Sequence, residues 1–145
     1  MIPACSLRKE DLMDSILYAR TKQLMLALDE LAGPGKPVCV ALTGPDLALL
    51  ALLRQPGARV HIEHMAIGKA YTCARMGCST KALHQRLINE QRTLDHFMDS
   101  GMTAMQGGVP LLDGNGTVLA GIGVSGRLPE EDEVIALKIR EFLSR

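Results

Sequence analysis

The chain has 145 residues, 47 % of them hydrophobic, and its 16 basic and 16 acidic residues give a formal net charge of zero. This length suits one domain over residues 1–145, with a core that needs neither disulfides nor metal. The balanced charge argues against nucleic-acid and membrane-surface binding. Only 3 % of the residues are aromatic, too few for base-stacking surfaces. The four cysteines form no C-x-x-C pair, so we expect free thiols and no metal site. The N-terminus shows no apolar signal segment, so we expect a cytoplasmic protein.

The first third of the chain predicts a helix followed by a β-hairpin. Apolar residues recur at helical spacing over about residues 7–32, with Ser6 as a good N-cap and a Gly-Pro pair at the end. Two short apolar runs, 37–43 and 47–54, then flank a Gly-Pro-Asp turn. The Leu and Ala of the second run would suit a helix, but its length and flanking turns favour a strand, so we predict a hairpin.

The middle of the chain predicts three helical segments. The longest covers about residues 61–77 and is closed by Gly77. A shorter helix over 80–89 follows, with Ser79 or Thr80 as its cap, and a third short helical piece covers 93–100.

The last third predicts a second hairpin and a terminal helix. Two apolar runs flank the turn Asp113-Gly114-Asn115-Gly116, which is a strong hairpin signal. Pro129 and the acidic residues after it begin the final helix, and basic residues follow towards its end. The order is therefore α-β-β-α-α-β-β-α, and because the strands come in hairpin pairs, we predict an α+β fold with an antiparallel sheet.

The stretch GIGVSG, residues 121–126, matches the dinucleotide-binding pattern G-x-G-x-x-G. The pattern binds a pyrophosphate only where it follows a strand, opens a helix and belongs to a βαβ unit. Here it lies within the second strand of a hairpin, so we expect no NAD site. The glycines of this region instead predict a bare patch of sheet against which a helix, a second subunit or a flat ligand could pack.

Several segments resemble the GlcG/HbpS family, also called haem-degrading or PduO C-terminal-like. They are GGVPLLDGNGTVLAGIGVSG followed by EEDEVIA, and upstream VALTGPDLALLALLRQPGA and HMAIGKAYTCARMGCST. The resemblance covers about residues 6–143. The chain departs from the family pattern at Gly44-Pro45-Asp46, which replaces an Asp-x-x-Gly loop, and at Cys73, which replaces an alanine.

The resemblance implies a profilin-like α+β fold and homo-oligomers, often octamers. Several family members bind haem, one branch is fused to a corrinoid-adenosylating enzyme, and the genes lie in clusters for glycolate, propanediol and glycerol use. Three functions therefore stay open. The chain is a ligand-binding oligomer for a tetrapyrrole (haem or a corrinoid), an enzyme acting on a small hydroxy acid or aldehyde, or an accessory protein for a metabolic enzyme.

Candidate site residues lie on the helix over 61–77, on the glycine hairpin and at the start of the last helix. His61 and His64 share a helix face and could ligate haem iron, although a surface pair also explains them. Lys69 matches the family's lysine, and an acid opposite it would make either a ligand anchor or a structural ion pair. The resemblance singles out Glu131 and Asp132 as candidates for this acid. The complete ligand-binding set is His61, His64, Lys69, Thr72, Gly107, Gly108, Gly123, Glu131 and Asp132. The ligand would lie between the hairpin and the helix, or at a subunit contact.

Overall fold

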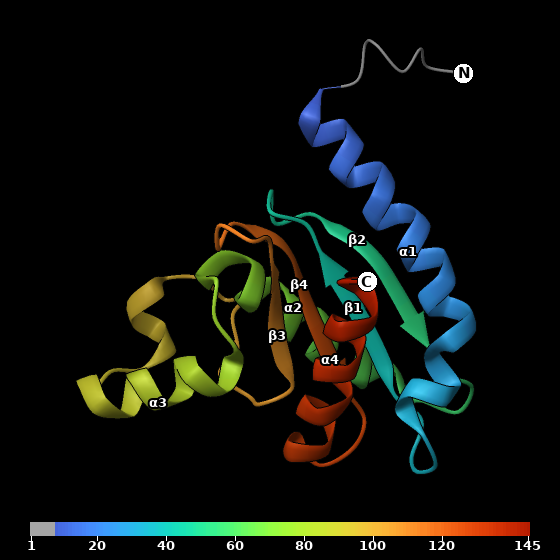
Figure 1. The fold of residues 1–145 in the computed structure, drawn as a ribbon. Helices are drawn as coiled ribbons and strands as arrows, with labels where there is room; N and C mark the ends of the chain where they lie inside the picture. Colours follow the sequence, from blue (N-terminus) through green and yellow to red (C-terminus); the bar gives the residue numbers. More distant parts are fainter. Residues whose placement is uncertain (1–7) are drawn as a thin grey trace.

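The computed structural model describes residues 8–145 and begins with the long helix α1, Lys9–Ala32 (Figure 1). Gly33 ends this helix with a φ of 66°, and its N–H donates to the carbonyl oxygen of Asp29 at 3.1 Å. The predicted end of the helix is confirmed, whereas the predicted cap Ser6 lies outside the described residues. Neither α1 nor any other helix within residues 8–145 is both long and apolar enough to cross a membrane.

Four antiparallel strands form one sheet in the order β2-β1-β4-β3. The two predicted hairpins are therefore confirmed, and they join through their β1 and β4 strands. In that central pair Ala41 lies opposite Gly123. The strands are β1 (Cys39–Thr43), β2 (Leu49–Arg54), β3 (Gly108–Leu112) and β4 (Val118–Ser125).

Three further α-helices follow the predicted order: α2 (Val60–Met76), α3 (Thr80–Glu90) and α4 (Pro129–Leu143). The predicted α+β fold is confirmed. The predicted helical piece over 93–100 is present but shorter than expected, since it is the 3₁₀ helix η2 (Leu94–Phe97). Met98 takes a left-handed φ of 51° immediately afterwards, which ends the turn.

Helices cover both faces of the sheet (Figure 1). α1 and α4 pack on one face, where the main core lies, and α2 packs on the other face, against β1 and β4. The two layers differ in side-chain size. The main core contains large aliphatic residues, whereas the α2 layer contains small ones. The main core includes Leu24, Leu28, Val40, Leu42, Ile122, Val124, Ile135 and Ile139, and the α2 layer includes Cys39, Ala41, Ala66 and Ala70.

Candidate functional site

Helix α2 lies directly on the backbone of strand β4, and two glycines make this possible. A Cβ atom at Gly121 would lie 1.9 Å from the carbonyl oxygen of Ala70, and one at Gly123 would lie 2.1 Å from that of Ala66. No side chain fits in so short a distance. The bare patch of sheet predicted from the sequence is therefore occupied by this chain's own helix. The G-x-G-x-x-G pattern lies in and just after a strand, away from the strand-to-helix turn of a βαβ unit.

The glycines at the start of β3 are enclosed in the same way. A Cβ atom at Gly107 would lie 2.7 Å from Lys69 Nζ, and one at Gly108 would lie 2.8 Å from Cys73 Sγ. Both of these atoms belong to α2, as does the helical backbone above Gly123. The predicted ligand position between the glycine hairpin and this helix does not fit the structure, because α2 fills that space.

Lys69 and Asp132 form a buried ion pair that joins α2 to α4. Lys69 Nζ lies 3.2 Å from Asp132 Oδ2 and donates to the carbonyl oxygen of Val124 at 2.7 Å. The two side chains are only 1 % and 2 % exposed. Asp132 Oδ1 also accepts the backbone N–H of Arg127 at 3.0 Å. Of the two roles that the sequence left open for an acid opposite Lys69, the structural ion pair is present.

Burial and pairing act in opposite directions on these two groups. Burial lowers the pKa of Lys69 and raises the pKa of Asp132, since each would be easier to bury uncharged. The opposite charge of the partner favours the ionised form of both. Each group therefore depends on the other to stay charged inside the protein.

Thr72 and Glu131, the other two polar residues of the predicted set, take different positions. Thr72 is buried; its hydroxyl donates to the carbonyl oxygen of Gly68 at 2.7 Å and accepts the N–H of Thr103 at 2.9 Å. It therefore tethers the segment before β3 to α2. Glu131 is exposed in the first turn of α4, where a negative charge suits the helix dipole.

His61 and His64 are both exposed on α2 but border different hollows. The hollow beside His61 also contains the cationic residues Lys36 and Arg59. The hollow beside His64 has a volume of about 270 Å³ and contains three methionines. Besides His64 it is lined by Met65, Gly68, Lys69, Ser100, Gly101, Met102, Thr103 and Met105. Both histidines therefore lie at the surface of one helix, as a surface pair would, but they line different hollows.

An acidic side chain fixes the outer wall of this His64 hollow. Asp99 Oδ2 accepts the hydroxyl of Tyr71 at 2.7 Å and pairs with Arg75 Nη1 at 2.8 Å. The hydrogen bond from Tyr71 is the main reason that the pKa of Asp99 lies below its usual range. These contacts hold the loop before β3 against α2. This wall could not be predicted from the sequence, because its contacts join residues 28 and 24 positions apart.

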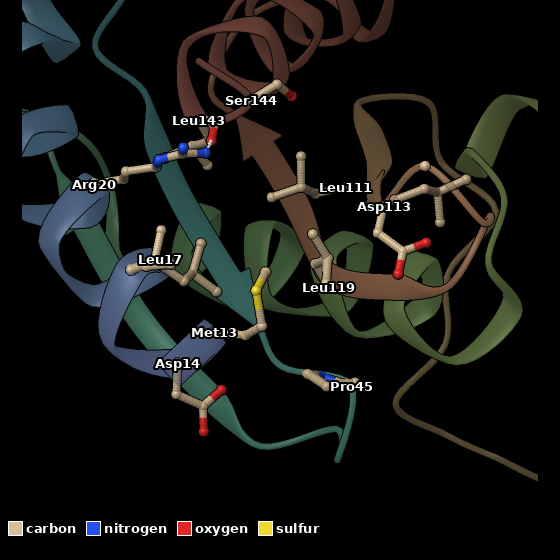
Figure 2. Close-up of a pocket in the computed structure, with 13 residues that line it drawn as sticks. Met13, Asp14, Leu17, Arg20, Pro45, Leu111, Asp113, Leu119, Leu143 and Ser144 are labelled. Atoms are coloured by element: carbon tan, nitrogen blue, oxygen red, sulfur yellow. Dashed lines mark hydrogen bonds between the residues drawn. The ribbon is translucent and has the colours of Figure 1, made fainter. Parts of the chain in front are cut away.

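A second cavity, of about 290 Å³, lies on the other face of the sheet between α1, α4 and the β-turns (Figure 2). Its lining is mostly aliphatic, and Arg20 lies at one side, where its guanidinium donates to the carbonyl oxygen of Leu143. Figure 2 shows Met13, Leu17, Leu111, Leu119 and Leu143 around this space. No histidine occurs among the described residues that line it. This cavity could not be predicted from the sequence, because its walls come from distant parts of the chain.

The cysteines of the described region are not placed for metal binding. Within residues 8–145, no group of three or more His, Cys, Asp or Glu side chains could hold a metal ion. Cys39 and Cys73 are buried and Cys78 is half-buried. Burial raises the pKa of Cys73 to about 12, so this thiol is almost wholly protonated at neutral pH.

These differences predict an order of thiol reactivity in the folded protein. With iodoacetamide at pH 8, we expect Cys78 to be modified first of the three, because its side chain is partly accessible. Cys39 and Cys73 should react only after unfolding in urea. Peptide mass spectrometry over a time course measures each rate, and native labelling of Cys73 as fast as that of Cys78 would contradict the described packing.

The sequence and the fold both have known counterparts. The sequence model described as "Haem degrading protein HbpS-like" matches residues 19–141. The chain belongs to the HbpS-like family. The structure of a double mutant of Streptomyces reticuli HbpS has 28 % sequence identity and a TM-score of 0.74, covering 86 % of this chain and 84 % of that one. A search of curated proteins finds no match.

Two more distant structures share the fold. PduOC, solved as a haem complex, has 23 % identity and a TM-score of 0.65, with 94 % of each chain covered. The Klebsiella pneumoniae protein ORFY has 16 % identity and a TM-score of 0.67, covering 99 % of this chain and 98 % of that one. The predicted resemblance to the GlcG/HbpS family is confirmed.

The His64 hollow contains side-chain groups of the kinds that ligate haem iron. Imidazole and thioether groups are the usual neutral ligands of haem iron. His64 is exposed at the rim, and Met105 is 43 % exposed beside it. A flexible methionine lining also adapts well to an extended apolar surface.

Proposed function

We propose that this protein binds haem in the His64 hollow, with the imidazole of His64 as an iron ligand. One observation carries the proposal. In a member of the HbpS-like family, an exposed histidine stands beside a hollow lined by Met65, Met102 and Met105. A bound haem would supply iron redox chemistry. The chain supplies an imidazole donor and thioether contacts.

His64 suits this role better than His61. The hollow beside His61 places Lys36 and Arg59 near the imidazole, and two cations oppose an iron centre of positive charge. The His64 hollow has no such pair. Its one cation, Lys69, is buried and already bound to Asp132 and to the Val124 carbonyl. The same burial withdraws support from an enzyme that would use Lys69 and Asp132 as substrate anchors.

Titration with hemin tests this proposal. We expect a saturable, shifted Soret band at about one haem per chain in the native protein and in His61→Ala. In His64→Ala the apparent affinity should fall at least tenfold, because an axial ligand is lost. Circular dichroism checks that each variant is folded. Because both histidines are exposed on one helix, His61→Ala is a matched control.

Two results would contradict the proposal. Unchanged binding in His64→Ala would exclude His64 as a ligand. Loss of binding in Met13→Ala instead would assign the haem to the cavity of Figure 2, where Met13 is a thioether donor. A parallel titration with cob(II)alamin tests whether a corrinoid binds in place of haem.

The finer parts of the proposal rest on the family resemblance. They are a cytoplasmic homo-oligomer, up to an octamer, that acts in glycolate, diol or glycerol metabolism. An accessory role for a metabolic enzyme of that pathway is the second candidate function. It is supported by the burial of Lys69 and Asp132, because neither side chain is accessible to a substrate. Co-purification with a metabolic enzyme encoded in the same gene cluster, from cells depleted of haem, tests this role.

A further inference from the structure

The hollow beside His61 is lined by side chains that carry positive charge or donate hydrogen bonds. It has a volume of about 290 Å³, and Lys36, Arg59 and His61 line it, all three exposed. Lys36 comes from the loop between α1 and β1, whereas Arg59 and His61 come from the start of α2. The other described residues of the lining are proline, glycine, alanine and isoleucine, so none is acidic. We call this space the cationic hollow.

The two fully charged residues of the cationic hollow are not neutralised by acidic side chains. Within residues 8–145, neither Lys36 nor Arg59 takes part in an ion pair. The acid in the first turn of α2, Glu63, is not part of the lining and pairs with Arg54 at 2.7 Å. The positive potential of the hollow therefore favours an anion from solution.

Hydrogen bonds that do not involve the cationic groups hold the walls of this hollow in place. The side-chain oxygen of Gln55 accepts the N–H of Val38 at 2.9 Å, and its carbonyl oxygen accepts the N–H of Ala58 at 3.1 Å. Arg127 Nε donates to the carbonyl oxygen of Lys36 at 2.8 Å. The loop before β1 and the turn before α2 are therefore fixed without a ligand. A ligand would have to order only side chains, which lowers the entropic cost of binding it.

We propose that the cationic hollow binds a phosphate group, either as inorganic phosphate or as the phosphoryl group of a small molecule. A phosphate monoester carries about 1.5 to 2 negative charges at pH 7 and so matches two cations better than a carboxylate does. The guanidinium of Arg59 supplies a planar set of N–H donors, Lys36 supplies a point charge and His61 a ring N–H. This site goes beyond the proposed function and does not depend on haem, because His64 borders a different hollow.

Titration with inorganic phosphate, followed by ¹H–¹⁵N NMR, tests this site. In the native protein we expect saturable shifts at the amides of residues 36, 57–62 and 126, with a dissociation constant on the order of 1 mM. Acetate at the same ionic strength should give no saturable shift. Lys36→Gln and Arg59→Gln should each weaken phosphate binding by about tenfold or more, since each removes a charge-assisted contact. His61→Ala should also weaken it but leave hemin binding native, so the phosphate site and the haem site fail separately.

Lys81→Gln is the matched control, because Lys81 is an exposed cation at the second residue of α3, as His61 is the second residue of α2. It should bind phosphate as the native protein does. Phenyl phosphate separates the two sources of the group: tighter binding than inorganic phosphate supports a phosphorylated small molecule, and weaker binding supports the free ion.

Three results would overturn the inference. They are the absence of saturable shifts with phosphate at about ten times the expected constant, an equal response to acetate, and native affinity in the folded double variant Lys36→Gln/Arg59→Gln. Circular dichroism shows whether each variant is folded.

Discussion

We expect the replacement of Lys69 with methionine to lower the free energy of unfolding by about 3–5 kcal/mol. Methionine has a similar length and is apolar, so the change removes the positive charge and the hydrogen bond to the Val124 carbonyl with little change in packing. Asp132 is then left 2 % exposed without its ionic partner, although it keeps the bond from the Arg127 N–H. Urea unfolding followed by circular dichroism measures this change, read from the shift in midpoint at constant slope.

The double variant Lys69→Met/Asp132→Leu separates the lost charge from lost packing. It removes both ions at once, and we expect it to recover most of the stability, since an apolar pair of similar volume often replaces a buried ion pair without loss. Lys138→Met, on the exposed surface of α4, should change stability by less than about 0.5 kcal/mol. A mild effect of Lys69→Met alone, equal to that of Lys138→Met, would contradict the described burial.

Local signals in the sequence were sufficient to predict the order of elements. Each hairpin is marked by turn residues between two apolar runs, and α4 begins at Pro129 as its proline and acidic residues indicate. The stretch over 47–54 was the ambiguous case, because its Leu and Ala suit a helix. It forms β2 since pairing with β1 satisfies its backbone, a tertiary effect that propensity does not include.

The candidate site could be predicted only in part, because the missing features depend on long-range contacts. The sequence marked the individual histidines, but not that His64 alone would stand beside three methionines. Its wall depends on Asp99, which meets Tyr71 and Arg75 from 28 and 24 residues away. The glycines were recognised as an unusual bare patch. Their cover by α2 could not be predicted, because it depends on how the helix packs on the sheet.

The close approach of α2 to β4 leads to the second large prediction. In Gly121→Ala the new methyl carbon would lie 1.9 Å from the carbonyl oxygen of Ala70 and 2.7 Å from the N of Ala74. Both are backbone atoms of a helix, so no rotamer change can relieve the contact, and α2 must move away from the sheet. We expect a loss of about 4 kcal/mol or more in the free energy of unfolding, a large share of the stability of an ordinary domain.

Gly114→Ala is the control, because nothing lies within 4 Å of a Cβ atom at that position in the turn between β3 and β4. The same chemical change should there alter stability by less than about 0.5 kcal/mol. Urea unfolding of the two variants against the native protein measures the difference. If Gly121→Ala were as stable as Gly114→Ala, the helix could not lie on the strand backbone. The space between them would then again be open to a ligand, and the haem site would have to be sought beneath α2 instead of beside it.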